Sequence, residues 1–303
     1  MLNYLNLIRY KNLLFIAFTQ FLIKYGLFEA FDAAITLSLF GCFLLALATV
    51  CLAAGGYIIN DVYDIETDRI NRGKDTVIGT HISEKTGTTW FLILNVTGVG
   101  IGFYLSNIIG WPAFSGLWIF ASAILYFYAT YLKQLALIGN IIVSCTIAGV
   151  VVIVGLYDLL PAINEQNQPA QSLLFSILLD YALFAFLINL LREMVKDQED
   201  IKGDYNAGMQ TLPIQLGIAR TNKVIFAVAI IPLVAIVYYI YNYLFENTYS
   251  TLYVLLLIVA PLLYVMVKIL DAEKRKQFTH LSLILKLILF FGLFSLGLHK
   301  FII

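Results

Sequence analysis

Two acidic segments carry the residues of this chain that are best suited to chemistry: "NDVYDIETD" at 60–68 and "DQEDIKGD" at 197–204. In each segment three aspartates are spaced three and then four residues apart. They are Asp61, Asp64 and Asp68 in the first, and Asp197, Asp200 and Asp204 in the second. On a helix this spacing places the three carboxylates within about 60° of arc and along about 10 Å of the axis. Each segment is therefore predicted to form an acidic stripe on one helix face, from which Glu66 points away.

The repeated stripes indicate that a positive ligand binds beside them, because like charges at these spacings repel one another by a few tenths of a kcal/mol per pair. Carboxylate oxygens suit hard divalent cations, and Mg²⁺ is typically held by one or two carboxylates together with the phosphate oxygens of a ligand. A single D-x-x-D pattern would more often be a solvated helix face. The matched pair instead predicts a Mg²⁺–diphosphate site.

Basic residues lie near both stripes in sequence or at the end of a neighbouring apolar run. They could offset the charge of a diphosphate and stabilise it as a leaving group. These candidate diphosphate-binding residues are Arg72, Lys74, Lys133, Arg192, Lys196 and Lys202. For each of them, a role in membrane orientation alone is the alternative interpretation.

The composition is that of an integral membrane protein. The chain has 303 residues, of which 61% are hydrophobic and only 13% charged, against about 25% charged in an average soluble domain. Runs long enough to cross a bilayer, about 20 residues each, lie near 12–28, 34–59, 89–108, 112–132, 138–158, 172–190, 222–244, 250–270 and 281–301. We therefore predict an all-α fold of nine transmembrane helices. Because each acidic segment follows an even-numbered span, we also predict two repeated four-helix units followed by a ninth helix.

The charge distribution predicts an orientation. Most of the 19 Lys and Arg residues fall in the N-terminal segment or after spans 2, 4, 6 and 8. The opposite loops carry the acidic residues Glu29, Asp32, Asp158, Glu165 and Glu246. By the positive-inside rule, the N-terminus and both acidic segments are expected to face the cytoplasm and the C-terminus to lie outside, with the cell inner membrane as the expected location.

The stretches "NDVYDIETDRINRGKD" and "REMVKDQEDIKGDYNAGMQTLPIQLG" resemble the two signature regions of the UbiA superfamily of intramembrane prenyltransferases. The resemblance covers essentially the whole chain, 1–303, as a single domain. It implies a helical bundle around a central cavity, in which Mg²⁺ held by both motifs binds an isoprenyl diphosphate. Matched residue by residue, the metal-binding positions are Asn60, Asp61, Asp64, Asp68, Asp197, Asp200 and Asp204. Of these, Asp64, Asp68, Asp200 and Asp204 are the expected catalytic residues.

The resemblance also suggests the substrates. "DRIN", "HIS" and "TLPI" are most similar to the digeranylgeranylglyceryl phosphate synthase branch, which implies transfer of a geranylgeranyl group to geranylgeranylglyceryl phosphate. However, "NRGKDTVIGTHIS" lacks the prolines usual in that branch. An aromatic acceptor such as the quinone precursor 4-hydroxybenzoate therefore stays open. Cation-coupled transport is an alternative of another class, although transporter sites usually lie near the bilayer midplane rather than at the ends of spans.

A prenyl cation needs protection from water and is stabilised by the electron-rich faces of aromatic rings. Polar residues within spans are further candidates for the cavity wall, because it is costly to bury them in lipid without partners. The candidate cavity residues are Asn12, Tyr126, Tyr131, Asn140 and Asn189. For the two tyrosines, helix packing or a position at the membrane interface is the alternative.

Overall fold

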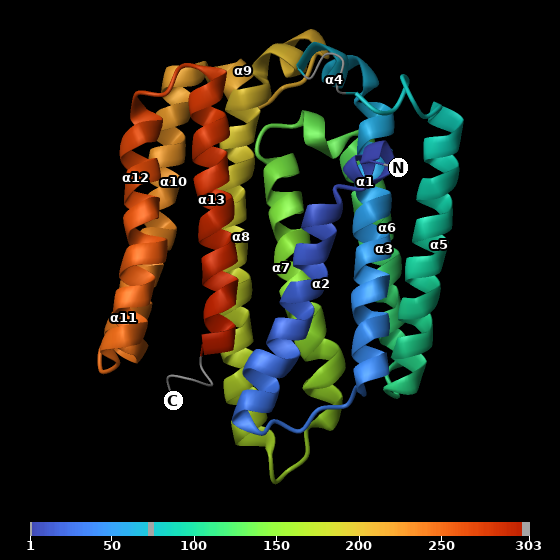
Figure 1. Cartoon of the computed structure of the whole chain (residues 1–303), viewed down its shortest axis with the longest axis vertical. Helices are drawn as coiled ribbons and strands as arrows, with labels where there is room; N and C mark the ends of the chain where they lie inside the picture. Colours follow the sequence, from blue (N-terminus) through green and yellow to red (C-terminus); the bar gives the residue numbers. More distant parts are fainter. Residues whose placement is uncertain (1, 72–75, 299–303) are drawn as a thin grey trace. The chain divides into compact units, whose positions relative to one another are not determined.

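The computed structural model describes residues 2–71 and 76–298. Within these ranges the chain forms helices, turns and two isolated bridges, and no β-strand (Figure 1). The helices in the described part that are long and apolar enough to span a membrane are Tyr10–Phe31, Leu39–Tyr63, Glu84–Ile108, Pro112–Thr130, Ile138–Ala162, Gln168–Asn206, Ile218–Leu244, Thr248–Leu270 and Arg275–Gly297. The predictions of an all-α fold and of nine spans over these residues are confirmed.

The sixth span differs most from its predicted bounds. Helix α8 runs without interruption over Gln168–Asn206, which is 39 residues, whereas the apolar run ends near residue 190. At 1.5 Å per residue this helix is about 58 Å long, roughly twice the thickness of a hydrocarbon core. Its polar C-terminal turns therefore extend beyond the hydrophobic stretch, and they carry the second acidic segment.

The described chain packs as two compact units, Met1–Lys133 with Gly149–Leu178, and Gln134–Ala148 with Leu179–Ile303. Helices α7 (Ile138–Asp158) and α8 each contribute residues to both units. In the first unit, α3 (Leu39–Tyr63) packs against α2 (Tyr10–Leu22), α5 (Glu84–Ile108) and α6 (Ser115–Thr130). The close packing of α5 and α6 requires a glycine, since a Cβ at Gly102 would lie 2.3 Å from the Trp118 ring.

The second unit is built on α10 (Ile218–Tyr239), α12 (Ala260–Leu270) and α13 (Arg275–Phe294), together with the C-terminal part of α8. Its core is a continuous aliphatic cluster that includes Ile188, Leu191, Ile225, Leu262 and Leu285. α11 (Thr248–Val254) continues into the same span as α12 through a π-helical turn. These contacts pack α8, the helix that carries the second acidic segment, against the core of the second unit.

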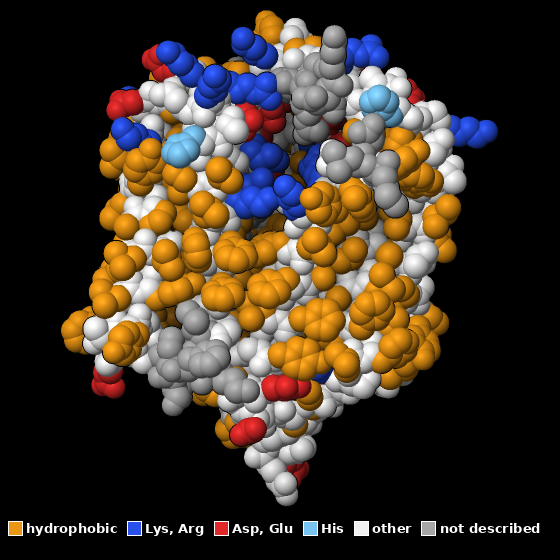
Figure 2. Space-filling model, in the orientation of Figure 1, with side chains coloured by type: hydrophobic (Ala, Val, Ile, Leu, Met, Phe, Trp, Pro, Cys, Tyr) orange, Lys and Arg blue, Asp and Glu red, His pale blue; other side chains and the backbone are white. Residues whose placement is uncertain are grey.

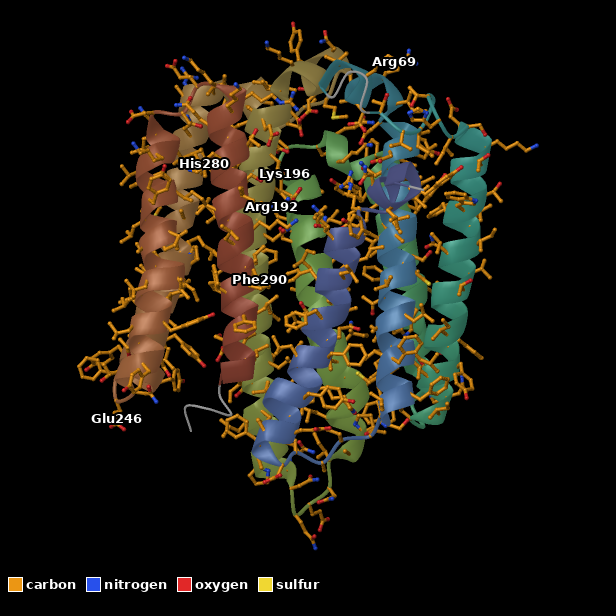
Figure 3. All side chains as sticks on the ribbon, viewed as in Figure 1. Arg69, Arg192, Lys196, Glu246, His280 and Phe290 are labelled. Carbon is orange, nitrogen blue, oxygen red and sulfur yellow. The ribbon has the colours of Figure 1, made fainter. Side chains whose placement is uncertain are left out.

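The kind of side chain on the surface changes along the length of the helices. On the face shown in Figure 2, hydrophobic side chains cover the middle of the helices, and charged side chains gather towards helix ends. Within the second unit, Glu246 lies at the opposite end from His280, Arg192 and Lys196 (Figure 3). A band of apolar surface between polar ends is the pattern expected of an integral membrane protein.

One charge predicted to lie in a loop is buried instead. Asp158 is the last residue of α7 and is 0% exposed. Its carboxylate lies 2.8 Å from Nζ of Lys24, which is 1% exposed on the π-helical turn Ile23–Phe28. Asp158 also accepts hydrogen bonds from the backbone N–H groups of Thr36 and Leu37. The pair fastens the first span and the segment after it to α7, within the first unit.

Candidate active site

The first motif lies at a break between two helices. α3 ends at Tyr63, Asp64 has φ −101° and ψ 11°, and α4 (Ile65–Asn71) follows at once. The backbone N–H of Asp64 still donates to the Asn60 carbonyl, and that of Asp68 to the Asp64 carbonyl. The first motif is therefore helical, as its spacing predicts, but it is divided between α3 and α4 at Asp64. Asp64 is a residue type whose short polar side chain favours helix ends over helix interiors.

Three of the predicted site residues meet around Asp64. Lys133 lies in the turn Leu132–Gln134 that follows α6, and its Nζ is 2.6 Å from Oδ1 of Asp64. Asn60 donates from Nδ2 to the other carboxylate oxygen at 2.7 Å, and its own Oδ1 lies 3.4 Å from Lys133 Nζ. The structure thus brings a predicted diphosphate-binding cation and two predicted metal ligands together, although Lys133 is far from the motif in sequence.

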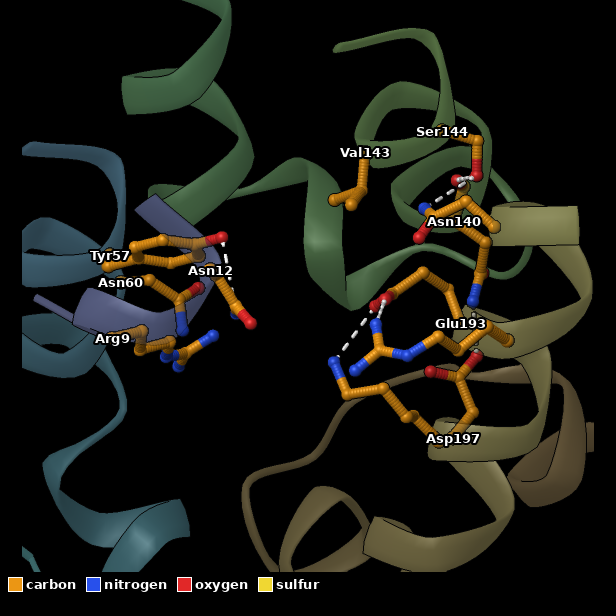
Figure 4. Close-up of polar contacts among 12 residues, drawn as sticks. Arg9, Asn12, Tyr57, Asn60, Asn140, Val143, Ser144, Glu193 and Asp197 are labelled. Carbon is orange, nitrogen blue, oxygen red and sulfur yellow. Dashed lines mark hydrogen bonds and ion pairs between the residues drawn. The ribbon is translucent and has the colours of Figure 1, made fainter. Parts of the chain in front are cut away.

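Asp61 contacts Arg9, which belongs to the basic N-terminal segment and was not among the predicted site residues. Nη2 of Arg9 lies 3.0 Å from Oδ1 of Asp61. The guanidinium also lies over the Tyr57 ring, with Cζ 4.7 Å from the ring centroid. Burial alone would lower the pKa of Arg9, but Asp61, Tyr57 and Asp68 more than offset this effect, so its pKa is raised and it stays charged. Asn12 is nearby, with Nδ2 3.5 Å from the Tyr57 hydroxyl (Figure 4).

The second motif lies on a continuous helix, as its spacing predicts, because Asp197, Asp200 and Asp204 all lie within α8. Asn140 of α7 donates from Nδ2 to Oδ2 of Asp197 at 2.9 Å (Figure 4). The Ser144 hydroxyl donates to the Asn140 carbonyl and accepts from Nδ2 of Asn189. Two predicted cavity residues, Asn140 and Asn189, thus belong to one buried network that joins α7 to α8.

Glu193, which was not among the predicted site residues, contacts both Arg192 and Lys196 beside the second motif. It is 8% exposed, with one carboxylate oxygen 2.8 Å from Nη1 of Arg192 and the other 3.0 Å from Nζ of Lys196. At the N-terminus of α13, Arg275 lies 3.7 Å from Asp200 and 3.9 Å from Glu199. In the sequence, Glu193 directly follows Arg192 and precedes Lys196 by three residues. Opposite charges three residues apart on a helix can pair, so this spacing could have indicated the contacts of Glu193. Nothing local in the sequence pointed to Arg275.

Other predicted site residues lie outside these clusters. Arg72 and Lys74 fall outside the described residues. Lys202 is exposed on α8. Tyr126 is 39% exposed and stacks on Phe91 with 6.0 Å between ring centroids, and Tyr131 follows the end of α6 and is 59% exposed. The roles predicted for Tyr126 and Tyr131 at the cavity wall stay predictions.

The donor atoms of both motifs suit a hard cation, since they are carboxylate and amide oxygens without thiol or imidazole. Among the described residues, no three His, Cys, Asp or Glu side chains gather into one cluster that could hold a metal by themselves. Basic or amide side chains contact Asp61, Asp64, Asp197 and Asp200. Such a site would share its ligands with an anion rather than enclose the metal, which is how Mg²⁺ is commonly held beside phosphates.

Together, the helical fold and the acidic motifs at helix ends define an integral membrane protein that combines carboxylates with cations in both units. The model of the UbiA prenyltransferase family matches residues 21–292, and the chain belongs to this family. The predicted family membership is confirmed.

The relatives of the chain include several digeranylgeranylglyceryl phosphate synthases. The protein from Methanothermobacter thermautotrophicus is 34% identical over 80% of this chain and 79% of its own length. The one from Sulfolobus acidocaldarius is 34% identical over 71% of this chain and 69% of its own length. The one from Sulfurisphaera tokodaii is also 34% identical, over 59% of this chain, and the match covers only 60% of that relative.

Solved structures share the fold. A structure of a digeranylgeranylglyceryl phosphate synthase has a TM-score of 0.67 at 21% identity, covering 98% of this chain and 97% of the other. A UbiA homolog from Archaeoglobus fulgidus, bound to DMAPP and Mg²⁺, has a TM-score of 0.56 at 19% identity, covering 97% and 99%. At these identities the likeness supports the fold alone.

Proposed function

We propose that this protein is a Mg²⁺-dependent prenyltransferase that moves a geranylgeranyl group from its diphosphate to geranylgeranylglyceryl phosphate within the membrane. The observation that carries the proposal is the cluster of Lys133, Asp64 and Asn60, with Lys133 Nζ 2.6 Å from the Asp64 carboxylate. A metal–diphosphate complex requires a cationic side chain, which binds phosphate oxygens, next to oxygen ligands, which bind the metal. Membership of the UbiA family favours this activity over cation transport.

The proposed metal ligands come from both motifs: Asn60, Asp61, Asp64, Asp68, Asp197, Asp200 and Asp204. When bound, Mg²⁺ would neutralise the diphosphate and make it a better leaving group. The catalytic role is proposed for Asp64, Asp68, Asp200 and Asp204. The proposed diphosphate-binding residues are Lys133, Arg192, Lys196 and Lys202, together with Arg72 and Lys74 of the segment that the structure does not describe.

The basic, amide and aromatic residues have different proposed roles. Arg192 can present two parallel N–H groups to phosphate, and Lys133 and Lys196 act as point charges. Asn140 holds the Asp197 carboxylate by a hydrogen bond, and Asn189 supports it through Ser144. Asn12, Tyr126 and Tyr131 are proposed to line the path of the prenyl chain, where aromatic faces stabilise positive charge and exclude water.

We also propose that both motifs face the cytoplasm. Support comes from the basic residues near the motif end of the helices, which include Arg192 and Lys196 in the second unit (Figure 3). Anionic residues contribute little to topology, whereas Lys and Arg near helix ends favour the cytoplasmic side. This orientation would give a diphosphate made in the cytoplasm direct access to both motifs.

Acceptor preference tests the proposed substrate. The purified chain, in lipid nanodiscs with labelled geranylgeranyl diphosphate and Mg²⁺, is given equal concentrations of geranylgeranylglyceryl phosphate, geranylgeranylglycerol and 4-hydroxybenzoate. We expect digeranylgeranylglyceryl phosphate, the product of the phosphorylated acceptor, to dominate over the other two products by about tenfold or more, detected by mass spectrometry. This expectation follows from the 34% identity to digeranylgeranylglyceryl phosphate synthases.

The two other acceptors separate the possible errors. A preference for 4-hydroxybenzoate would overturn the acceptor but keep prenyl transfer. Equal use of geranylgeranylglycerol, which lacks the phosphate, would show that the acceptor phosphate is not recognised. The absence of product with every acceptor would remove the proposed activity itself.

A further inference from the structure

Arg9 has an unusual backbone for its residue type. It lies at the junction between α1 (Leu2–Leu7) and α2, with φ 51° and ψ 51°. Residues other than glycine rarely adopt this left-handed conformation, and they keep it only where the surrounding contacts determine it. The Arg9 N–H donates to the Asn6 carbonyl, and the Arg9 carbonyl accepts from the Asn12 N–H at 2.8 Å. The turn thereby ends α1 and starts α2 as a separate helix.

The Arg9 side chain makes two contacts of different kinds. Its edge donates to the Asp61 carboxylate at 3.0 Å, and its face lies 4.7 Å from the centroid of the Tyr57 ring. Both partners lie on α3, about one turn apart. Because a planar guanidinium can stack and donate at the same time only in a narrow range of orientations, these contacts define the position of Asp61 as well as that of Arg9.

Arg9 and Asp61 form part of the wall of a cavity. In the first unit a space of about 300 Å³ is lined by Arg9, Asp61, Asp68 and Thr76, among others. Leu7 of α1 also lines it and is 1% exposed in a hydrophobic cluster with Ile58 and Ile59 of α3. The α1 segment is thus anchored over the motif end of α3. Two of the three carboxylates of the first motif share this cavity with Arg9.

We propose that Arg9 is a positioning residue for the first motif: through Asp61 it fixes the carboxylates that bind the metal complex of the prenyl diphosphate. Tyr57 holds the guanidinium in place. This inference rests on the proposed function and adds a residue that the family motif does not contain. Arg9 acts through Asp61 here, and it is not assigned a contact with the substrate.

A double-mutant cycle tests whether Arg9 acts through Asp61. The affinity of the full chain in nanodiscs for geranylgeranyl diphosphate with Mg²⁺ is measured by calorimetry for wild type, Arg9→Gln, Asp61→Asn and the double variant. We expect each single change to weaken binding about tenfold, the size of effect typical of a hydrogen bond to a charged group. The double variant should be no weaker than Asp61→Asn. Lys11→Gln, an exposed cation two residues away, is the matched control and should bind like wild type.

Additive losses, or an Arg9→Gln protein with wild-type affinity, would overturn the positioning role. Thermal unfolding of each variant identifies a protein that has not folded. If Arg9→Gln fails to fold, the same cycle is run with Arg9→Lys, which keeps the charge but loses the planar fork and is expected to weaken binding less. Failure of wild type to bind any prenyl diphosphate would refute the proposed function, whereas normal wild-type binding with additive variants refutes this inference alone.

Discussion

Replacing Asp64 with alanine is expected to lower Mg²⁺-dependent prenyl transfer by about a hundredfold to a thousandfold, the effect typical of losing one preorganised polar group at a reacting centre. Asp64 is bonded to both Lys133 and Asn60. Alanine would remove a proposed metal ligand and leave the buried Lys133 ammonium without its carboxylate. Transfer is measured with labelled geranylgeranyl diphosphate, and Asp200→Ala in the second motif is expected to behave in the same way.

Glu66→Ala provides the matched control for this prediction. Glu66 is exposed on α4, two residues from Asp64, and its spacing predicts that it points off the acidic stripe. Its loss removes the same charge from the same segment and should leave transfer within about twofold of wild type, as is usual for a surface substitution. Full activity in folded Asp64→Ala protein would contradict the assignment of the first motif.

Breaking the Lys24–Asp158 pair is expected to have the largest effect on stability. Lys24→Met should destabilise the protein by about 3–5 kcal/mol, because it leaves the buried Asp158 carboxylate without its charged partner. The two side chains are 2% and 1% exposed and 2.8 Å apart. Reversible unfolding in mixed detergent micelles measures the change in the free energy of unfolding.

A second substitution shows whether the loss comes from the unpaired charge. Lys24→Met combined with Asp158→Leu removes both charges, and this protein should be more stable than Lys24→Met alone, since no buried charge remains unpaired. Exposed Glu165 supplies the control, and Glu165→Gln should change stability by less than about 0.5 kcal/mol. A Lys24→Met protein as stable as wild type would show that the pair does not hold the first span to α7.

Hydropathy and spacing predicted the spans and the second motif well. Apolar runs of sufficient length leave few alternatives to membrane helices, and the described residues bear them out. The continuous helix through Asp197, Asp200 and Asp204 also agrees with the 3.6-residue period. The length of α8 was missed because its last turns are polar, and a polar helix outside the hydrocarbon has no hydropathy signal.

The features that could not be predicted from the sequence are mainly contacts between residues far apart in the chain. Arg9 and Asp61 are 52 residues apart, and Lys24 and Asp158 are 134 apart. Neither pair has a local spacing that would indicate a contact. The break at Asp64 was equally hidden, because the flanking residues include neither glycine nor proline, the two strongest helix breakers. Helix packing decides each of these features.

The stoichiometry of metal-dependent transfer tests whether this chain is a Mg²⁺-dependent prenyltransferase. The purified chain in nanodiscs is given geranylgeranyl diphosphate and geranylgeranylglyceryl phosphate, and released diphosphate and prenylated lipid are measured in the same samples. We predict one diphosphate released for each prenyl chain transferred, loss of both products with EDTA, and recovery of both with Mg²⁺. Transfer that continues undiminished in EDTA would show that the activity does not need Mg²⁺, and the absence of any prenylated product with Mg²⁺ present would refute the proposed prenyl transfer.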